Sequence, residues 1–193
     1  MTLKPGCLMG KEAPMNLPNK LTLLRVALIP LCLLFTMLGL NVLAAALFII
    51  ACLTDYLDGY IARKQGIVTN FGRFADPVAD KILTLTMMTA LLARGDYFWW
   101  AAVIVAAREL AVDGLRLVAV DQGIVIPAGN LGKVKTNFQF FSILSSLLKA
   151  PFWLSLTLAI LMALLTLISG IQYFIGGKDL FRQDIKLSAR DKR

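Results

Sequence analysis

The feature that most constrains this fold is a series of six apolar segments, each close to the length of a membrane-spanning helix. A helix needs ~20 mostly apolar residues to cross the hydrocarbon core of a bilayer. With 58% hydrophobic residues, 17% charged residues and a mean hydropathy of +0.73, the chain has the composition of a membrane protein. We therefore predict an all-α polytopic membrane protein with six transmembrane helices. The predicted spans are Leu21–Leu40, Val42–Tyr60, Pro77–Ala93, Tyr97–Val120, Val134–Leu148 and Phe152–Phe174.

Polar residues inside some of these segments leave the number of spans open. The second, third and fourth segments carry charges, and the fifth is short and polar at its start. Four or five spans are therefore the alternatives to six. The first apolar run is too long for a cleaved signal peptide and has no small-residue cleavage site after it.

Lysine and arginine are distributed unevenly among the predicted connections. Eighteen of the twenty fall on one side of the membrane, and only Arg94 and Lys149 fall on the other. Cytoplasmic loops collect cations, so we expect an even number of spans, both termini in the cytoplasm and a multi-pass protein of the cell membrane. The net charge of +8 would then face anionic lipid headgroups or anionic substrates, not nucleic acid.

The chain contains no histidine, and its three cysteines, Cys7, Cys32 and Cys52, are far apart. The absence of histidine removes the commonest general base and the commonest nitrogen ligand of zinc. The cysteines have neither the spacing of a zinc site nor the even number of a disulfide framework. Any catalysis must therefore depend on carboxylates, cations or hydroxyl groups.

Four aspartates stand out in the central sequence DYLDGYIARKQGIVTNFGRFADPVAD. Asp55 and Asp58 are three residues apart and Asp76 and Asp80 are four apart, so each pair lies on one face of a helix. The pairs fall at the facing ends of the second and third predicted helices, where four negative charges would repel one another. Divalent cations relieve this repulsion, and ligation by oxygen alone suits Mg²⁺, Mn²⁺ or Ca²⁺. We therefore predict a metal site here.

The residues between the two pairs suit a phosphate group. Gly59 and Gly72 allow close approach of the backbone, and Arg63, Lys64 and Arg73 supply donors for phosphoryl oxygens. Metal-bound carboxylates beside an arginine are typical of phosphoryl transfer. Three other interpretations are solvated helix caps, the ion path of a cation transporter, and a non-catalytic lipid-binding scaffold.

From Asp55 to Asp80 the sequence resembles the signature of the CDP-alcohol phosphatidyltransferase family, D-x2-D-G-x2-A-R-x8-G-x3-D-x3-D, with every spacing intact. The resemblance implies a six-helix membrane enzyme, typically a homodimer, that displaces CMP from a CDP-linked lipid with an alcohol acceptor. It implies that Asp55, Asp58 and Asp76 bind two divalent cations, Mg²⁺ or Mn²⁺, in each subunit. It also implies that Asp80 shares the metal contact and deprotonates the acceptor hydroxyl.

The resemblance further implies a site for the nucleotide of CDP-diacylglycerol. Its residues would be Asp55, Asp58, Gly59, Ala62, Arg63, Thr69, Asn19 and Thr22. Small residues there leave room for cytidine, and the arginine holds the phosphates. The alternative for Asn19, Thr22 and the nearby Arg25 is that they cap and anchor the first helix.

Cations inside the later apolar segments point to an anionic acceptor. The predicted pocket consists of Arg108, Arg116, Lys133 and Lys135. The alternative for the two arginines is internal pairing with Glu109, Asp113 or Asp121. We expect Asp113, one turn from Arg116, to weaken that arginine's hold on a phosphate, so Arg108 ranks first.

Several motifs resemble the phosphatidylglycerophosphate synthase branch of the family: PN-x-LT-x-x-R, AREL-x-x-x-GLR, GK-x-KT-x-x-Q and SGIQYF-x-x-GKD. The resemblance implies sn-glycerol 3-phosphate as the acceptor, with phosphatidylglycerol or inositol phosphate as the alternatives. It places a membrane catalytic domain at residues 15–176, with its active site facing the cytoplasm. We interpret residues 1–14 as a disordered leader or non-native start, and residues 177–193 as a charged cytoplasmic tail.

Overall fold

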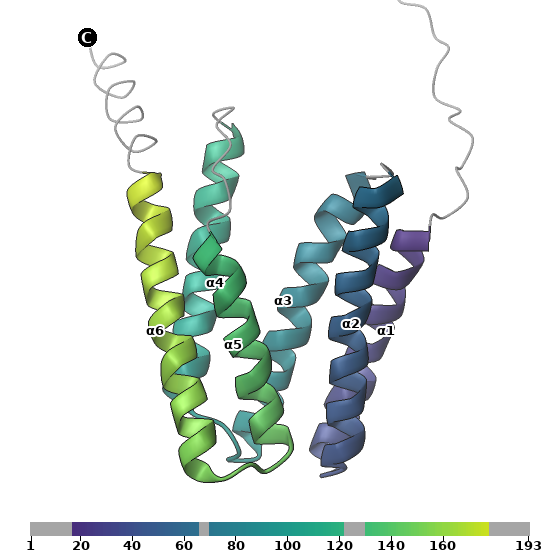
Figure 1. Cartoon of the computed structure of the whole chain (residues 1–193), viewed down its shortest axis with the longest axis vertical. Helices are drawn as coiled ribbons and strands as arrows, with labels where there is room; N and C mark the ends of the chain where they lie inside the picture. The colour runs from purple at the N-terminus through teal and green to yellow at the C-terminus, as the bar shows by residue number, and fades with distance from the viewer. Residues whose placement is uncertain (1–16, 66–69, 122–129, 178–193) are drawn as a thin grey trace, which may run out of the picture.

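The protein, seen in a computed structural model, forms helices that alternate in direction (Figure 1). The structure describes residues 17–65, 70–121 and 130–177, and all regular structure within these ranges is helical. Of the residues in these ranges, the side chains of 17–20, 56–65, 70–74, 121, 130 and 133 lie outside the description. The helices are α1 Leu17–Met37, α2 Asn41–Gln65, α3 Asn70–Ala93, α4 Trp99–Asp121, α5 Asn130–Leu147 and α6 Phe152–Gly176.

The prediction of six helices is confirmed within the described residues, although each helix extends beyond its predicted span at one end or at both. α2 continues past Tyr60 to Gln65, and α5 begins four residues before Val134. α3 was expected to begin at Pro77 but begins at Asn70. A proline inside a helix removes one backbone hydrogen bond and crowds the preceding turn, but membrane helices tolerate it because neighbouring groups satisfy the freed carbonyl. Hydropathy detects the apolar part of each helix, whereas backbone hydrogen bonding continues into its polar end.

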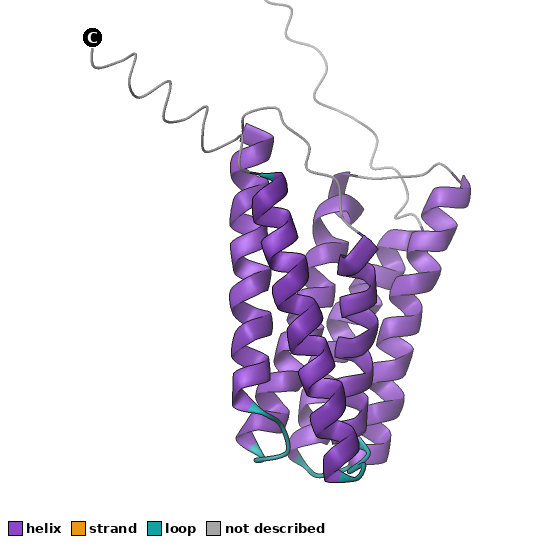
Figure 2. Cartoon of the chain, turned by 60° about the vertical axis from the view of Figure 1, so that its left-hand side comes forward, coloured by secondary structure: helices purple, strands orange, loops and turns teal. Residues whose placement is uncertain are grey.

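Three short turns join the helices at one end of the bundle (Figure 2). Each turn has one residue in the left-handed region: Gly39 and Gly95 at φ 75° and Lys149 at φ 53°. In the first turn the Gly39 N–H donates to the carbonyl of Thr36, and the next N–H donates to that of Phe35, both at 3.0 Å. This hydrogen-bond pair is a common helix ending, in which glycine is favoured because it has no Cβ. The three turns reverse the chain, so α1–α2, α3–α4 and α5–α6 are antiparallel pairs.

Helix packing divides the bundle into two halves that meet at α3 and α5. α1 packs against α2 and α3, α6 packs against α4 and α5, and α3 contacts both α4 and α5. The buried core includes Met87 and Met88, which pack between the helices. Phe48 on α2 stacks on Phe140 of α5 with ring centroids 5.4 Å apart.

Many large apolar side chains lie on the outer surface, as expected for a protein surrounded by lipid. Val42, Leu117 and Trp153 are among the most exposed. Within the described ranges, α6 is the one helix long and apolar enough to cross a membrane by itself. α1 and α2 contain shorter apolar stretches, at Leu21–Met37 and Asn41–Asp55.

The two cations at the turn end of the bundle share one acidic partner. Asp96 lies 2.8 Å from Arg94 Nη2 and 2.8 Å from Lys149 Nζ. Arg94 also donates to the Thr36 carbonyl at 2.6 Å and to Asn41 Oδ1 at 2.8 Å. Asp96 therefore neutralises one of the two positive charges at this end.

Candidate active site

Two side chains of α1 hold aspartates of the neighbouring helices. Arg25 is fully buried, and its Nη1 lies 2.7 Å from Oδ1 of Asp55 on α2. One turn earlier, the buried Thr22 donates a hydrogen bond of 2.5 Å to Oδ1 of Asp76 on α3. A buried charge requires a partner, and residues three apart lie on one face of a helix. α1 thus contacts one carboxylate from each helix that carries the predicted metal site.

Asp80 lies on α3 one turn after Asp76 and connects two groups of charges. Its carboxylate is within electrostatic range of Asp55 and also of Lys135 and Glu109. Asp55 is in turn within range of Asp76. Asp55, Asp76 and Asp80 therefore form one electrostatic group, and Asp80 joins it to Lys135 of α5.

The other residues of the predicted donor site have no described side chains. The last turns of α2 carry Asp58, Gly59, Ala62 and Arg63, and the first turn of α1 carries Asn19. The side chains of these five residues lie outside the described part of the structure, and so does the whole of Thr69.

The metal prediction rests on the chemistry of the carboxylates. Among the described side chains, no three of the types His, Cys, Asp and Glu are grouped closely enough to hold an ion. Asp55, Asp76 and Asp80 offer oxygen ligands alone, which fits Mg²⁺ or Mn²⁺. Asp58 is the fourth predicted ligand.

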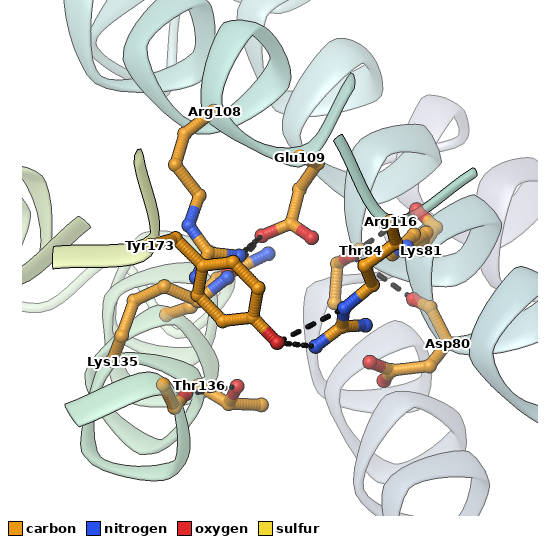
Figure 3. Close-up of a pocket in the computed structure, with 11 residues that line it drawn as sticks. Asp80, Lys81, Thr84, Arg108, Glu109, Arg116, Lys135, Thr136 and Tyr173 are labelled. Atoms are coloured by element: carbon orange, nitrogen blue, oxygen red, sulfur yellow. Dashed lines mark hydrogen bonds and ion pairs between the residues drawn. The ribbon is translucent and has the colours of Figure 1, made fainter. Parts of the chain in front are cut away.

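A polar pocket of about 200 Å³ lies between α3, α4, α5 and α6 (Figure 3). Its volume is below the ~300–1,000 Å³ of pockets for drug-sized ligands, so it suits a small molecule. Four cations line it against two carboxylates, which favours an anion. The cations are Lys81, Arg108, Arg116 and Lys135, and the carboxylates are Asp80 and Glu109. Three of the four predicted acceptor residues are thus brought together, and the side chain of the fourth, Lys133, is outside the described part.

Glu109 on α4 pairs with two of these cations. Its buried carboxylate accepts from Lys135 Nζ and, at 3.3 Å, from Arg108 Nη1. Arg108 Nη2 also donates to Ser169 Oγ on α6 at 2.8 Å. The alternative of internal pairing is therefore confirmed for Arg108, which still lines the pocket.

Arg116 has a different kind of partner. Its Nε and Nη2 both donate to the hydroxyl of Tyr173, at 3.1 and 2.6 Å. Asp113 forms its ion pair with Lys81 on α3 and not with Arg116, so an effect of Asp113 on phosphate binding by Arg116 stays a prediction. Within the described residues, Arg116 bonds only to a neutral group. Its charge remains available to an anion, so it ranks above Arg108.

Sequence reasoning assigned no role to Lys81, Ser169 or Tyr173. Ser169 and Tyr173 belong to the SGIQYF motif. The family resemblance includes this segment but does not indicate which residues it contacts. Their contacts with Arg108 and Arg116 depend on how α6 packs against α4.

The chain is similar to known enzymes over most of its length. The family model for CDP-alcohol phosphatidyltransferase matches residues 15–170. A probable phosphatidylglycerophosphate synthase of Mycobacterium tuberculosis is 40% identical over 177 residues, which cover 87% of this chain and 84% of that protein. A CDP-diacylglycerol–glycerol-3-phosphate 3-phosphatidyltransferase of Bacillus subtilis is 39% identical over 180 residues, covering 82% of this chain and 93% of that protein. A protein of the same name from Rickettsia bellii is 38% identical over 176 residues, which cover 86% of this chain and 97% of that protein.

Proposed function

The chain belongs to the CDP-alcohol phosphatidyltransferase family, and we propose that it transfers a phosphatidyl group from CDP-diacylglycerol to sn-glycerol 3-phosphate. The products are phosphatidylglycerophosphate and CMP, so the protein acts in phospholipid biosynthesis. The names of the relatives in Mycobacterium, Bacillus and Rickettsia support this acceptor. The cationic pocket of about 200 Å³ supports it as well, because a small phosphorylated alcohol needs both positive charge and limited space.

The observation that carries the proposal is the position of Asp80. Its side chain lines the cationic pocket (Figure 3), and it is within electrostatic range of Asp55 in the carboxylate group. A base that removes the acceptor's proton must lie within hydrogen-bond reach of the acceptor hydroxyl, and that hydroxyl must lie beside the phosphorus that it attacks. Asp80 is the described residue that belongs to both regions.

In the proposed reaction the hydroxyl oxygen of the acceptor attacks the phosphorus that carries the diacylglycerol. A new P–O bond forms there, the bond to the CMP oxygen breaks, and the hydroxyl proton passes to Asp80. Arg116 and Lys135 bind the acceptor's phosphate, joined by Arg108 and Lys133. A carboxylate is the natural base because the chain has no histidine.

The donor side of the site is proposed from the carboxylates and the family signature. Asp55, Asp58, Asp76 and Asp80 would hold two Mg²⁺ or Mn²⁺ ions, which would neutralise charge on the pyrophosphate of the donor. The proposed nucleotide contacts are Asp55, Asp58, Gly59, Ala62, Arg63 and Thr69. Asn19 remains a proposed nucleotide contact too. The contact of Thr22 with Asp76 supports a different role for this residue, which is to orient a metal ligand.

We further propose that all six helices cross the cell membrane, with both termini and the active site on the cytoplasmic side and with two chains forming a homodimer. The uneven distribution of lysine and arginine supports this orientation. So does the pairing of Arg94 and Lys149 with Asp96 at the opposite end. The family match over residues 15–170 supports a catalytic domain at residues 15–176.

Release of CMP from labelled CDP-diacylglycerol tests the acceptor directly. The purified protein is supplied with sn-glycerol 3-phosphate, phosphatidylglycerol or inositol phosphate in separate reactions, each with Mg²⁺. We expect release to depend on glycerol 3-phosphate and the lipid product to be phosphatidylglycerophosphate. Equal dependence on inositol phosphate would contradict the assignment, and release with none of the alcohols would contradict the activity.

Replacing Asp80 by asparagine tests its role as base. A general base contributes ~10²–10⁴-fold to a rate, so CMP release should fall at least about 100-fold while the protein stays folded. Asp96→Asn makes the same chemical change at the opposite end of the bundle and should leave kcat within about twofold of the wild type, because Asp96 pairs with Arg94 and Lys149 there and does not line the pocket. Substantial activity in Asp80→Asn would refute the role.

A further inference from the structure

We propose that Tyr173 is a positioning residue that holds Arg108 and Arg116 as a preformed clamp for the phosphate group of the acceptor. This rests on the proposed function, because the acceptor's phosphate is the anion that the clamp binds. Tyr173 lies near the end of α6, the two arginines lie on α4, and all three line the polar pocket (Figure 3).

The hydroxyl and the ring of Tyr173 both contact Arg116. The hydroxyl accepts two hydrogen bonds from the guanidinium, and the guanidinium carbon lies 5.1 Å from the centre of the ring. Tyr173 itself is buried, so its position is fixed by packing. Two donors on one oxygen together with a cation–π contact restrict both the place and the tilt of the guanidinium.

The ring of Tyr173 and a second residue of α6 hold Arg108. Its guanidinium carbon lies 5.9 Å from the centre of the Tyr173 ring, and its Nη2 donates to Ser169. Ser169 is four residues before Tyr173, so both lie on one face of α6. Between them, Gly170 allows close approach: a Cβ there would lie 3.2 Å from Arg108 Cγ. The Nε of Arg108 is buried without a hydrogen-bond partner among the described residues, which leaves a donor for a bound oxyanion.

A tyrosine serves this purpose because it is neutral. Lys135 is held by Glu109 and Lys81 by Asp113, and each carboxylate cancels the charge that it positions. Tyr173 instead orders Arg116 and leaves its full positive charge for a ligand. A long flexible side chain loses rotational freedom when it binds, so ordering it beforehand strengthens binding. The arginine fork also matches two oxygens of a phosphate.

Tyr173→Phe removes the hydroxyl and keeps the ring, so it separates positioning from packing. We expect the KM for glycerol 3-phosphate to rise about tenfold, which corresponds to about 1.4 kcal/mol, while kcat and the KM for CDP-diacylglycerol change less than about twofold. The matched control is Tyr97→Phe. Tyr97 is also buried, and its hydroxyl bonds to Ser142 at 2.9 Å at the other end of the bundle. Its loss should leave the KM for glycerol 3-phosphate unchanged.

A second variant, Tyr173→Leu, removes the ring as well and should raise this KM further, because Arg108 then loses its cation–π contact. An unchanged KM in Tyr173→Phe would overturn the proposal, as would a fall in kcat alone or an equal shift in Tyr97→Phe. These outcomes require a wild-type protein that releases CMP with glycerol 3-phosphate. If the wild type does not, the proposed function fails instead, and the two failures are distinguished.

Discussion

Replacing Glu109 by glutamine tests how strongly the cations of the pocket depend on one buried carboxylate. Glu109 is 8% exposed and accepts from Lys135 and Arg108, whose side chains are 6% and 11% exposed. Glutamine keeps the shape of the side chain and one oxygen acceptor but removes the negative charge. Lys135 would then lie in a buried environment beside a neutral group.

The expected cost follows from the surroundings of the pair. Removing one partner of a buried ion pair typically destabilises a protein by ~3–5 kcal/mol. Two features of this site reduce the cost: Asp80 is within electrostatic range of Lys135, and Arg108 keeps its hydrogen bond to Ser169. We therefore expect a loss at the lower end, ~3 kcal/mol. That loss is about two orders of magnitude in the equilibrium constant of folding.

Equilibrium unfolding in mixed detergent micelles, followed by tryptophan fluorescence, measures this loss. The double variant Glu109→Gln/Lys135→Met removes both charges and should recover most of the stability, because apolar replacement of a buried ion pair is often close to neutral. A loss within the ~0–1 kcal/mol typical of exposed pairs would refute the argument. So would a double variant that is no more stable than Glu109→Gln.

Two further predictions concern single polar contacts of α3. Asp113→Asn removes the charge that neutralises Lys81, so the KM for glycerol 3-phosphate should fall roughly 2–5-fold, and by a smaller factor at high salt. The measurement is CMP-release kinetics at two ionic strengths. An unchanged or higher KM would contradict the prediction. Thr22→Val removes the hydroxyl that bonds to Asp76, so Mn²⁺ affinity measured by electron paramagnetic resonance without substrates should weaken about tenfold. Thr36→Val, whose hydroxyl bonds to a backbone carbonyl near the turn end, is the control and should bind Mn²⁺ as the wild type does.

The positions of the helices could be predicted where apolar length and turn residues agree. The span predicted at Phe152–Phe174 is observed as Phe152–Gly176, because Pro151 precedes the helix and the chain is apolar throughout. The predicted lengths of α2 and α3 are too short at their polar ends. Hydropathy measures transfer into lipid, whereas the length of a helix depends on backbone hydrogen bonds. That α3 begins before Pro77 matters for the site, because it places Asp76 within the helix rather than before it.

The partners of the charged side chains could be predicted only in part. Asp113 and Arg116 are three residues apart on α4, a spacing that favours an ion pair on an isolated helix. In the folded protein α3 packs against α4 and brings Lys81 to Asp113, while α6 brings Tyr173 to Arg116. Sequence spacing describes one helix at a time, so it cannot rank a neighbour on the same helix against one on another.

The arrangement of α3 explains how a base and an anion pocket come to share one side chain. Asp76 is bonded to α1 through Thr22, and Lys81 is bonded to α4 through Asp113. These contacts fix α3 on two sides within two turns, and Asp80 lies between them. The position of Asp80 on α3 is therefore set by both halves of the bundle. A shift of either half would move Asp80 relative to the carboxylates or to the pocket, so the α1 and α4 contacts of α3 belong to the catalytic geometry as well as to the packing.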